Sequence, residues 1–355
     1  MKILFVCAFY RPYKCGIGDY VHQLAKSLSI SNDVYIFPIN NLHNKKQYLY
    51  SFNRKKKFIF NKSFFNLYKI TKIINPNIIH YQDIINPNCN FFTNTINSFI
   101  PYLVIFKKKI GFMQTFHEAT GRKYFISFLL SYFYPSFKIS VRPKFEDLLP
   151  SFFFLKKKFY YIGSGPTLDD PNIDFLDLTT LRKNLKKSKK RLFIHFGFIY
   201  SHKGIEKIID LINKKTDIVY IIGEIRDDEY FNLVLSKIKE SHLEDNFIHI
   251  PFLDSTLLYK YLVVADAILL LFSNVSGSWN SSVQSAIQSK SFVLTTSFSK
   301  TGYDSNNNIF YANPNDFLLL KKALNKYSGN KNNNLLVNKW KKIAKDHLKI
   351  YMTNV

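Results

Sequence analysis

The sequence predicts an α/β protein built from two doubly wound domains, and three observations lead to this prediction. Apolar runs of strand length alternate with amphipathic helical stretches over most of the chain, which is typical of parallel sheets covered by helices on both faces. Hydrophobic residues make up 46% of the sequence and charged residues 21%, a globular composition. The length of 355 residues suffices for two domains of ordinary size.

The first 165 residues are predicted to form the N-terminal domain. Their apolar runs and amphipathic stretches predict strands at 2–9, 33–39, 78–82, 110–116, 137–142 and 159–165, and helices at 18–29, 63–74, 88–99 and 122–134.

A polar stretch with two prolines and a run of charges follows, and it indicates a linker with a short helix over 166–190. The alternation then resumes, so we assign 191–331 to a second domain. The tail, 332–355, has apolar residues at near-helical spacing and is expected to form a last helix that packs back toward the first domain. Within the second domain we predict strands at 191–199, 217–224, 247–253, 267–272, 291–296 and 308–312, and helices at 203–213, 227–241, 255–264 and 281–289.

The formal net charge of +25 predicts an anionic partner, such as nucleic acid, an anionic membrane surface or a phosphorylated substrate. Residues 1–165 carry 24 Lys and Arg against 6 Asp and Glu, a net charge of +18, and the remainder carries +7. Basic clusters at 54–57, 107–109 and 156–158 lie beside Phe and Tyr, which suits a bilayer interface. Solvated loops, or the lysine-rich composition that an AT-rich genome produces, explain the same clusters without a partner. The basic residues are dispersed and no recognition module is visible, so we expect no nucleic-acid partner.

The cysteines and the apolar segments indicate a cytoplasmic protein. Cys7, Cys15 and Cys89 form no disulfide framework and have no metal-ligand spacing, so a reducing compartment fits. The apolar start is too short for a secretory signal, and no segment has the length needed to span a bilayer. At most, the protein is expected to lie peripherally on the inner face of the cytoplasmic membrane.

A loop with two glycines, "CGIGDY" at 15–20, follows the first predicted strand and leads into a helix. Gly16 and Gly18 let backbone N–H groups approach a ligand closely, and the helix directs its positive end to the same place. The loop therefore favours an anionic ligand. Its spacing is neither that of a dinucleotide-binding loop nor that of a nucleoside-triphosphate loop.

The order of motifs along the chain resembles that of the family 4 glycosyltransferases. The resemblance covers nearly the whole sequence, in order and at proper distances. It rests on these segments: "RPYKCGIGDYVHQLAKSL" (11–28), "NIIHYQ" (77–82), "QTFHE" (114–118), "YIGSGP" (161–166), "FGFIYSHKG" (196–204), "YIIGE" (220–224), "YLVVADAILLLF" (261–272) and the closing "IAKDHLKIY" (343–351).

This resemblance implies a GT-B fold, which consists of two Rossmann-like domains that face each other across a cleft. The acceptor binds mostly on the first domain and the nucleotide-sugar on the second. The implied activity is a retaining sugar transfer that needs no cofactor and no bound metal, because a cationic side chain and helix N-termini stabilise the leaving diphosphate.

The resemblance also implies roles for individual residues. His117 and Lys203 are the candidate catalytic residues, with His117 contacting the transferred sugar or its acceptor and Lys203 reaching the diphosphate. Asp19 and Glu118 are candidates for acceptor binding. The donor-binding candidates are Gly16, Gly18, Gly197, Lys203, Glu224, Ser281 and Ser282. Some of these positions also have an ordinary structural explanation: a core histidine at His117, a solvated turn lysine at Lys203, or a helix N-cap at Asn280 or Ser281.

The sequence departs from the family pattern at three places. The usual pair of glycines in the first loop is Cys15–Gly16, and Phe198 stands where an arginine is frequent, which leaves Lys203 as the main phosphate cation. The common pair of glutamates spaced eight residues apart is absent, and the serine-rich turn "GSWNSSVQ" (277–284) takes its place. The donor sugar therefore cannot be named from these residues.

Two functions of different classes follow. The first is a retaining glycosyltransferase that moves a sugar from a nucleotide-sugar to a growing surface glycan or a polyprenyl-linked acceptor, as in O-antigen or capsule polysaccharide biosynthesis. The second is a catalytically silent GT-B scaffold subunit of a glycan-assembly complex, which the loss of both glutamates favours. Retention of Gly16, His117 and Lys203 argues against the second function.

Overall fold

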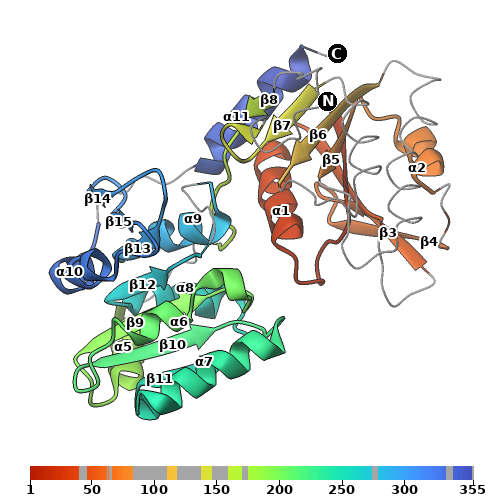
Figure 1. The fold of residues 1–355 in the computed structure, drawn as a ribbon. Coiled ribbons are helices and arrows are strands. Elements are labelled where there is room, and N and C mark those ends of the chain that lie inside the picture. Colours follow the sequence, from red (N-terminus) through yellow and green to blue (C-terminus); the bar gives the residue numbers. More distant parts are fainter. Residues whose placement is uncertain are drawn as a thin grey trace. The chain divides into compact units, whose positions relative to one another are not determined.

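The computed structural model describes residues 1–39, 46–61, 63, 66–82, 110–117, 137–145, 159–169, 175–273, 279–332 and 339–353. The chain forms two compact units (Figure 1). The first unit consists of Met1–Gly165 together with Asn338–Val355, and the second of Pro166–Val337.

The first unit is built on a mixed sheet with the strand order β4-β3-β2-β1-β5-β6-β7-β8. The strands from β2 to β8 through β1 pair in parallel, whereas β3 pairs antiparallel with both β2 and β4. The bounds are β1 (Lys2–Cys7), β2 (Asp33–Pro38), β3 (Lys46–Ser51), β4 (Lys56–Asn61), β5 (Ile78–Gln82), β6 (Gly111–Phe116), β7 (Phe137–Ser140) and β8 (Phe159–Tyr161).

Helices cover both faces of this sheet because the central strands are apolar on both sides. Ile3, Phe5 and Cys7 of β1 pack in one core cluster with α1 (Gly16–Leu28) and α11 (Lys339–Met352). Leu4 and Val6 point to the opposite face, into the cluster that contains α2 (Asn66–Ile74). The last helix therefore belongs to the core of the first unit, and α1 and α11 contact each other directly.

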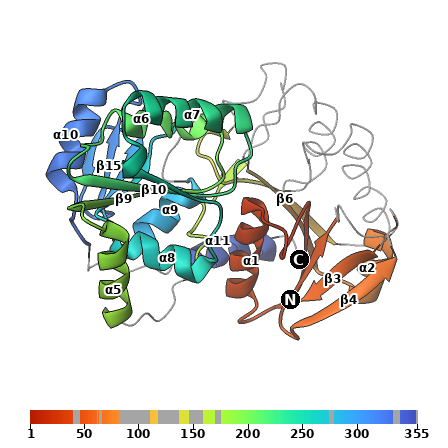
Figure 2. The same cartoon turned by 90° about the horizontal axis from the view of Figure 1, so that it is seen from below.

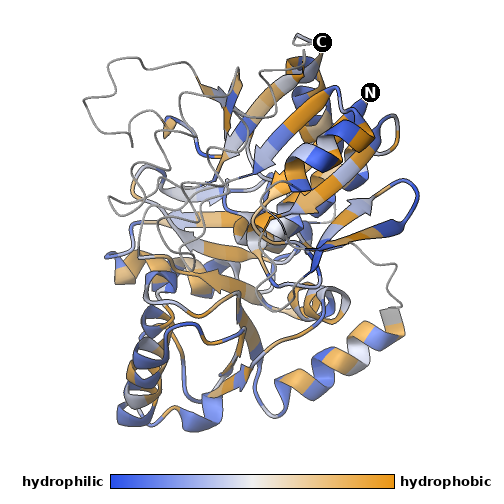
Figure 3. Cartoon of the chain, turned by 90° about the vertical axis from the view of Figure 1, so that its right-hand side faces the viewer, coloured by the Kyte–Doolittle hydropathy of each residue, from blue (hydrophilic) through white to orange (hydrophobic). Residues whose placement is uncertain are grey.

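The second unit is built on a sheet with the strand order β11-β10-β9-β12-β13-β15-β14, in which only β14 is antiparallel to its neighbour. Figure 3 shows that its strands are largely hydrophobic while its helices are two-sided. The bounds are β9 (Arg191–Phe196), β10 (Asp217–Ile222), β11 (Phe247–Ile250), β12 (Ala267–Leu270), β13 (Val293–Thr296), β14 (Gly302–Asp304) and β15 (Ile309–Ala312).

Two sets of helices enclose this second sheet (Figure 2). Phe193, Val219 and Ile221 pack with one set, and Leu192 and Ile194 pack with the other. The first set is α6 (Glu206–Ile209), α7 (Asp228–Glu240) and α10 (Phe317–Tyr327), and the second is α5 (Phe175–Lys186), α8 (Ser255–Val264) and α9 (Ser281–Gln288).

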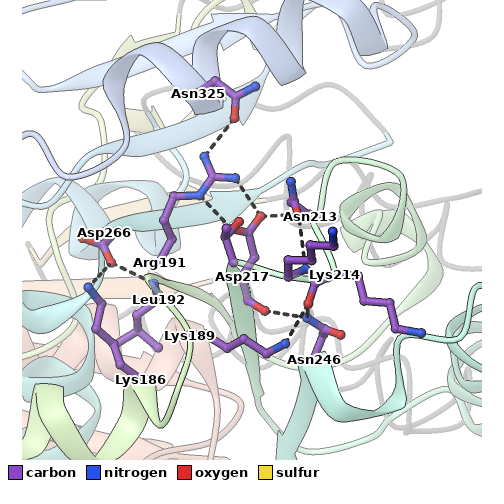
Figure 4. Close-up of polar contacts among 12 residues, drawn as sticks. Lys186, Lys189, Arg191, Leu192, Asn213, Lys214, Asp217, Asn246, Asp266 and Asn325 are labelled. Carbon is purple, nitrogen blue, oxygen red and sulfur yellow. Dashed lines mark hydrogen bonds and ion pairs between the residues drawn. The ribbon is translucent and has the colours of Figure 1, made fainter.

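A buried polar cluster joins the amino ends of the strands in the second unit (Figure 4). The Arg191 guanidinium donates to both carboxylate oxygens of Asp217, each at 2.7 Å, and to Asn325 Oδ1 at 2.8 Å. The Asp217 side chain is fully buried, and it also accepts from the backbone N–H of Asn213 at 2.8 Å. These charges satisfy one another at the amino ends, so they stabilise the fold and face away from the carboxyl ends where ligands bind.

The structure differs from the predicted elements at several places. The β3–β4 hairpin was not predicted, because β4 is exposed along most of its length and shows no alternation of buried and exposed residues. The expected helix 203–213 is a 3-10 turn, η3 (Ser201–Lys203), followed by the single turn α6. Helix α10 and strand β14 were also missed. The predicted helices at 88–99 and 122–134 lie outside the described residues.

The segment 166–190, expected as a linker with a short helix, contributes to the second unit. Its helix α5 packs against α8, and Leu178, Leu181 and Leu185 join the core on that face of the sheet.

The two glycines that open α1 have different surroundings. A Cβ on Gly18 would lie 2.9 Å from the Phe9 carbonyl oxygen, whereas nothing lies within 4 Å of the equivalent position at Gly16. Gly18 is buried and Gly16 is exposed. The fold therefore requires a glycine at 18, where the helix meets the backbone that follows β1, and not at 16.

We expect Gly18→Ala to lower the free energy of unfolding of the first unit by about 1–3 kcal/mol, because backbone must move to admit the methyl group. The matched variant Gly16→Ala should leave it unchanged or raise it by about 0.5–1 kcal/mol, since alanine favours a helix. Trp340 lies in the first unit, so its fluorescence in a Trp279→Phe background reports urea unfolding of that unit. Equal losses in the two variants would show that the contact with Phe9 does not set this requirement.

Candidate functional site

The carboxyl ends of β1, β5 and β6 carry the candidate residues of the first unit. Cys15 occupies the N-cap of α1 in an extended conformation and makes no side-chain cap hydrogen bond. Asp19, in the first turn of α1, accepts a hydrogen bond from Arg11 Nε at 3.2 Å, and both side chains are about one-third exposed. Its carboxylate is therefore already engaged with a cation at the position where an acceptor contact was predicted.

His117 follows directly after β6 and is held from two sides. Its Nε2 lies 3.0 Å from Gln82 Oε1, at the end of β5. The ring of Tyr20, from α1, meets the imidazole edge to face with the ring centroids 4.8 Å apart. Three elements thus position this histidine. Glu118, the other candidate from the same segment, lies outside the described residues.

The environment of His117 keeps its imidazole neutral. The pKa of His117 is lowered to about 3, mainly by burial, and the positive charge of Arg142 and the nearby His347 contribute in the same direction. At physiological pH the ring therefore carries one N–H and one lone pair. It can donate or accept a hydrogen bond without adding charge.

Three predicted residues of the second unit converge at the carboxyl end of β9. Gly197 directly follows β9 and has a φ of +115°, a conformation that side-chain-bearing residues rarely adopt. The place where a Cβ would sit lies 3.9 Å from Ser282 Oγ and 4.0 Å from Lys203 Nζ. We call Gly197, Lys203 and Ser282 the second-unit site. A side chain at position 197 would occupy the space between the hydroxyl and the ammonium.

The turn that carries Lys203 is pressed against the end of β12. Gly204 caps η3 in the left-handed region, with a φ of 63°, and a Cβ there would lie 2.0 Å from the Leu271 carbonyl oxygen. The Lys203 ammonium lies 5.0 Å from the centroid of the Phe272 ring, within the range of a cation–π contact. These contacts aim the lysine along the strand ends.

The N-terminus of α9 supplies the serines of the site. Asn280 is its N-cap residue, and its side chain accepts a hydrogen bond from the Ser282 backbone N–H at 2.9 Å. That N–H is therefore occupied within the protein, and Ser281 and Ser282 contribute their partly buried hydroxyl groups. The positive end of the α9 dipole adds to the charge of Lys203. Residues 274–278 of the serine-rich turn lie outside the described residues.

Glu224 lies two residues after the end of β10, and its carboxylate pairs with Arg226 at 3.2 Å. The Arg226 guanidinium lies over the Phe198 ring, 4.9 Å from its centroid. Lys203 was expected to be the main phosphate cation because Phe198 replaces an arginine of the pattern that the sequence resembles, and the structure places the Arg226 guanidinium on that phenylalanine. Sequence reasoning missed Arg226, and its position two residues after Glu224 was the available signal.

His195 was also missed, although it lies within the quoted "FIHFG" run. It is fully buried in β9, and its Nδ1 donates to the Leu269 carbonyl oxygen at 2.9 Å. Burial lowers the pKa of His195 to about 4, and the positive charge of Lys203 acts in the same direction. The ring is neutral, so Lys203 has no competing cation in the strand beneath it.

The described residues contain neither a metal-binding cluster nor a membrane-spanning helix. Among them no three His, Cys, Asp or Glu side chains gather in a way that could hold a metal ion. In the same part of the chain, no helix combines the length and the hydropathy needed to cross a membrane.

No protein-family model and no curated protein matches the sequence. The fold, in contrast, is similar to that of solved structures. Sucrose-phosphate synthase from Thermosynechococcus elongatus superposes with a TM-score of 0.69 at 12% identity, over 99% of this chain and 98% of that one. A glycosyltransferase from Rickettsia africae gives 0.65 at 15% identity, over 99% and 93%. Anabaena HepE in complex with UDP and glucose gives 0.64 at 13% identity, over 100% and 95%. The structural neighbours are GT-B glycosyltransferases, and this chain has the α/β GT-B fold with two Rossmann-like units.

Proposed function

We propose that the protein is a retaining glycosyltransferase that transfers a sugar from a nucleotide-sugar donor to a growing surface glycan or a lipid-linked acceptor. The single observation that carries the proposal is the convergence of Lys203 Nζ and Ser282 Oγ on the bare Gly197. A cation, a hydroxyl group and a helix N-terminus around exposed backbone form a site for a diphosphate. The full-length GT-B fold, and HepE with bound UDP and glucose, support the same assignment.

In the proposed reaction, the bond between the anomeric carbon and the diphosphate oxygen breaks while the acceptor hydroxyl attacks from the same face. The acceptor oxygen forms the new bond, and the leaving phosphate takes the hydroxyl proton. Lys203 and the N-terminus of α9 stabilise the negative charge that develops on the diphosphate. His117, neutral and held by Gln82 and Tyr20, hydrogen-bonds a hydroxyl group of the sugar or the acceptor. We also propose Glu224, Gly16 and Gly18 as donor-binding residues, and Asp19 and Glu118 as acceptor-binding residues.

The donor is the first thing to establish. We expect a panel of UDP-, GDP-, dTDP- and ADP-sugars to give one clear increase in melting temperature without added magnesium, because Lys203 and α9 supply the positive charge. A requirement for a divalent ion would contradict this account of the diphosphate site. Binding of a donor without transfer to any acceptor, including hydrolysis to water, would favour the alternative, a catalytically silent scaffold subunit.

We expect Lys203→Ala to weaken binding of the matching nucleoside diphosphate and to reduce turnover more than tenfold. The reason is that removing a charge that stabilises the transition state costs several kcal/mol, and about 1.4 kcal/mol is a factor of ten. Calorimetry and a transfer assay measure the two effects. Lys215→Ala, at an exposed position of the same unit, is the control and should behave as the wild type. Unchanged binding and turnover in Lys203→Ala would remove this lysine from the site.

The location of the basic residues supports a membrane-bound acceptor. Arg54, Lys55, Lys56 and Lys57 lie at the turn and first half of β4 and are exposed. Phe58 and Ile59 follow on the same edge strand, 41% and 58% exposed. Adjacent cations and exposed apolar side chains fit the interface of an anionic bilayer. We propose that the β3–β4 hairpin holds the protein there peripherally; the clusters at 107–109 and 156–158 lie outside the described residues.

We expect the wild type to bind anionic vesicles and to be released by salt, since ions screen such contacts beyond about 10 Å at 0.1 M. Replacing residues 54–57 by glutamine should reduce this binding strongly, at roughly 1 kcal/mol per basic residue near the surface. The matched control replaces the exposed lysines at 214, 215, 321 and 322. Flotation at graded salt measures both. Equal loss in the two variants would indicate that net charge alone, and not the hairpin, determines binding.

A further inference from the structure

A row of hydrogen bonds runs through the interior of the first unit and ends at His117. It begins at Tyr351 on α11, whose hydroxyl oxygen lies 2.6 Å from His80 Nδ1. His80 Nε2 lies 3.0 Å from the side-chain nitrogen of Gln82, and Gln82 Oε1 lies 3.0 Å from His117 Nε2. Tyr351, His80 and Gln82 are fully buried. Bulk water is therefore excluded from the middle of the row.

Both imidazoles in the row are neutral. Burial holds the pKa of His80 well below its usual range, with His347 and His117 as further causes, and it lowers the pKa of His117 to about 3. A neutral imidazole donates at one nitrogen and accepts at the other. The bond made by one nitrogen therefore determines what the other can do.

The side-chain amide of Gln82 gives the row a direction. In the observed orientation of the amide, its oxygen, which only accepts, faces His117 Nε2, so that this nitrogen carries the proton; its nitrogen, which only donates, faces His80 Nε2, which accepts. His80 then donates from Nδ1 to the Tyr351 hydroxyl. Thr115 Oγ1, 2.8 Å from His80 Nε2 and 3.4 Å from the Gln82 nitrogen, steadies both side chains. Its hydroxyl can donate or accept, so it fits either direction.

If the donor and acceptor roles in this row were exchanged at one hydrogen bond, they would have to be exchanged at every other one. If the Gln82 amide turned over, its nitrogen would donate to His117 Nε2, and His117 would carry its proton on Nδ1. The Gln82 oxygen would accept from His80 Nε2–H, and His80 Nδ1 would accept from the Tyr351 hydroxyl. The tautomer of His117 is thus coupled to the hydroxyl group of a residue on the last helix.

We propose that Gln82 is the positioning residue that fixes His117 as its Nε2–H tautomer, and that Tyr351 sets the direction of the row through His80. In this tautomer Nδ1 of His117 carries the lone pair, which can accept a hydrogen bond from a ligand hydroxyl. The use of this nitrogen in sugar transfer rests on the proposed function. The tautomer itself is a property of the folded protein and can be measured without a substrate.

The test is nitrogen-15 NMR of the full chain labelled at histidine, at pH 7, where the two ring nitrogens of His117 report its tautomer. In the wild type we expect Nε2 protonated and Nδ1 bare. Gln82→Met removes the acceptor at similar size, so both tautomers should become populated. Tyr351→Phe removes the acceptor of His80 Nδ1–H, and a buried N–H without a partner is costly. His80 should therefore change tautomer, the Gln82 amide should turn, and His117 should shift to Nδ1–H.

A double variant separates the row from a general loosening of the core. An ionised glutamate at position 82 accepts from both neighbours, so a row containing Gln82→Glu has no direction. Adding Tyr351→Phe to Gln82→Glu should leave His117 protonated on Nε2. Tyr20→Phe is the matched control: this tyrosine contacts the His117 ring, and among the described residues its buried hydroxyl has no hydrogen-bond partner. It should leave the tautomer unchanged.

Each outcome decides the inference. An unchanged His117 tautomer in Gln82→Met would overturn the role of Gln82, and an unchanged tautomer in Tyr351→Phe would overturn the role of Tyr351. If the proposed function holds, both variants should lower kcat by roughly tenfold, which corresponds to a loss of about 1.4 kcal/mol of transition-state stabilisation. Binding of the nucleoside diphosphate should stay unchanged. Coupled tautomers in a protein that transfers no sugar would reject the proposed function and leave the row intact.

Discussion

The parallel pairing of β9 with β10 is the constraint on which the second unit depends. At the amino ends, the bidentate hydrogen bonds from the Arg191 guanidinium to the buried Asp217 carboxylate connect the two strands. At the carboxyl ends, a Cβ on Gly223 would lie 1.9 Å from the Gly197 carbonyl oxygen, so the two backbones approach each other too closely there for a side chain at position 223. Because the strands run in parallel, the pair of Arg191 and Asp217 lies at the end of the sheet opposite to Lys203 and Ser282.

The core of the first unit contains several buried polar side chains. His80, Gln82, Thr115 and Tyr351 are buried among apolar strands, where an unpaired polar group is costly. They hydrogen-bond to one another, and the row ends at the partly buried His117. A network in which every member is paired holds its side chains in one arrangement. The same contacts that satisfy the core therefore determine how His117 meets a ligand.

The positive charge of the chain is used in more than one way. Arg191 forms an ion pair with the buried Asp217, and Lys331 donates hydrogen bonds to the carbonyl oxygens of Val263 and Ala265. The exposed cluster at 54–57, in contrast, lies on an edge strand beside Phe58 and Ile59. Charged residues on an edge also prevent sheets from pairing with one another. The net charge alone therefore says little about a partner, and the surroundings of each cluster decide what it can contact.

The sequence by itself determined the α/β class, because buried parallel strands need continuous apolar runs and each run is visible locally. It also placed Gly197, Lys203 and Ser282 as candidates, through motifs that the comparisons with solved structures support at the level of the GT-B fold. Their roles stay predictions. It did not reveal the β3–β4 hairpin, whose exposed strand has no burial pattern, or the link from Tyr351 to His117. Only the tertiary structure decided these, since hydrogen bonds between residues as far apart as His80 and Tyr351 depend on how α11 packs against the first sheet and leave no periodic signal in the chain.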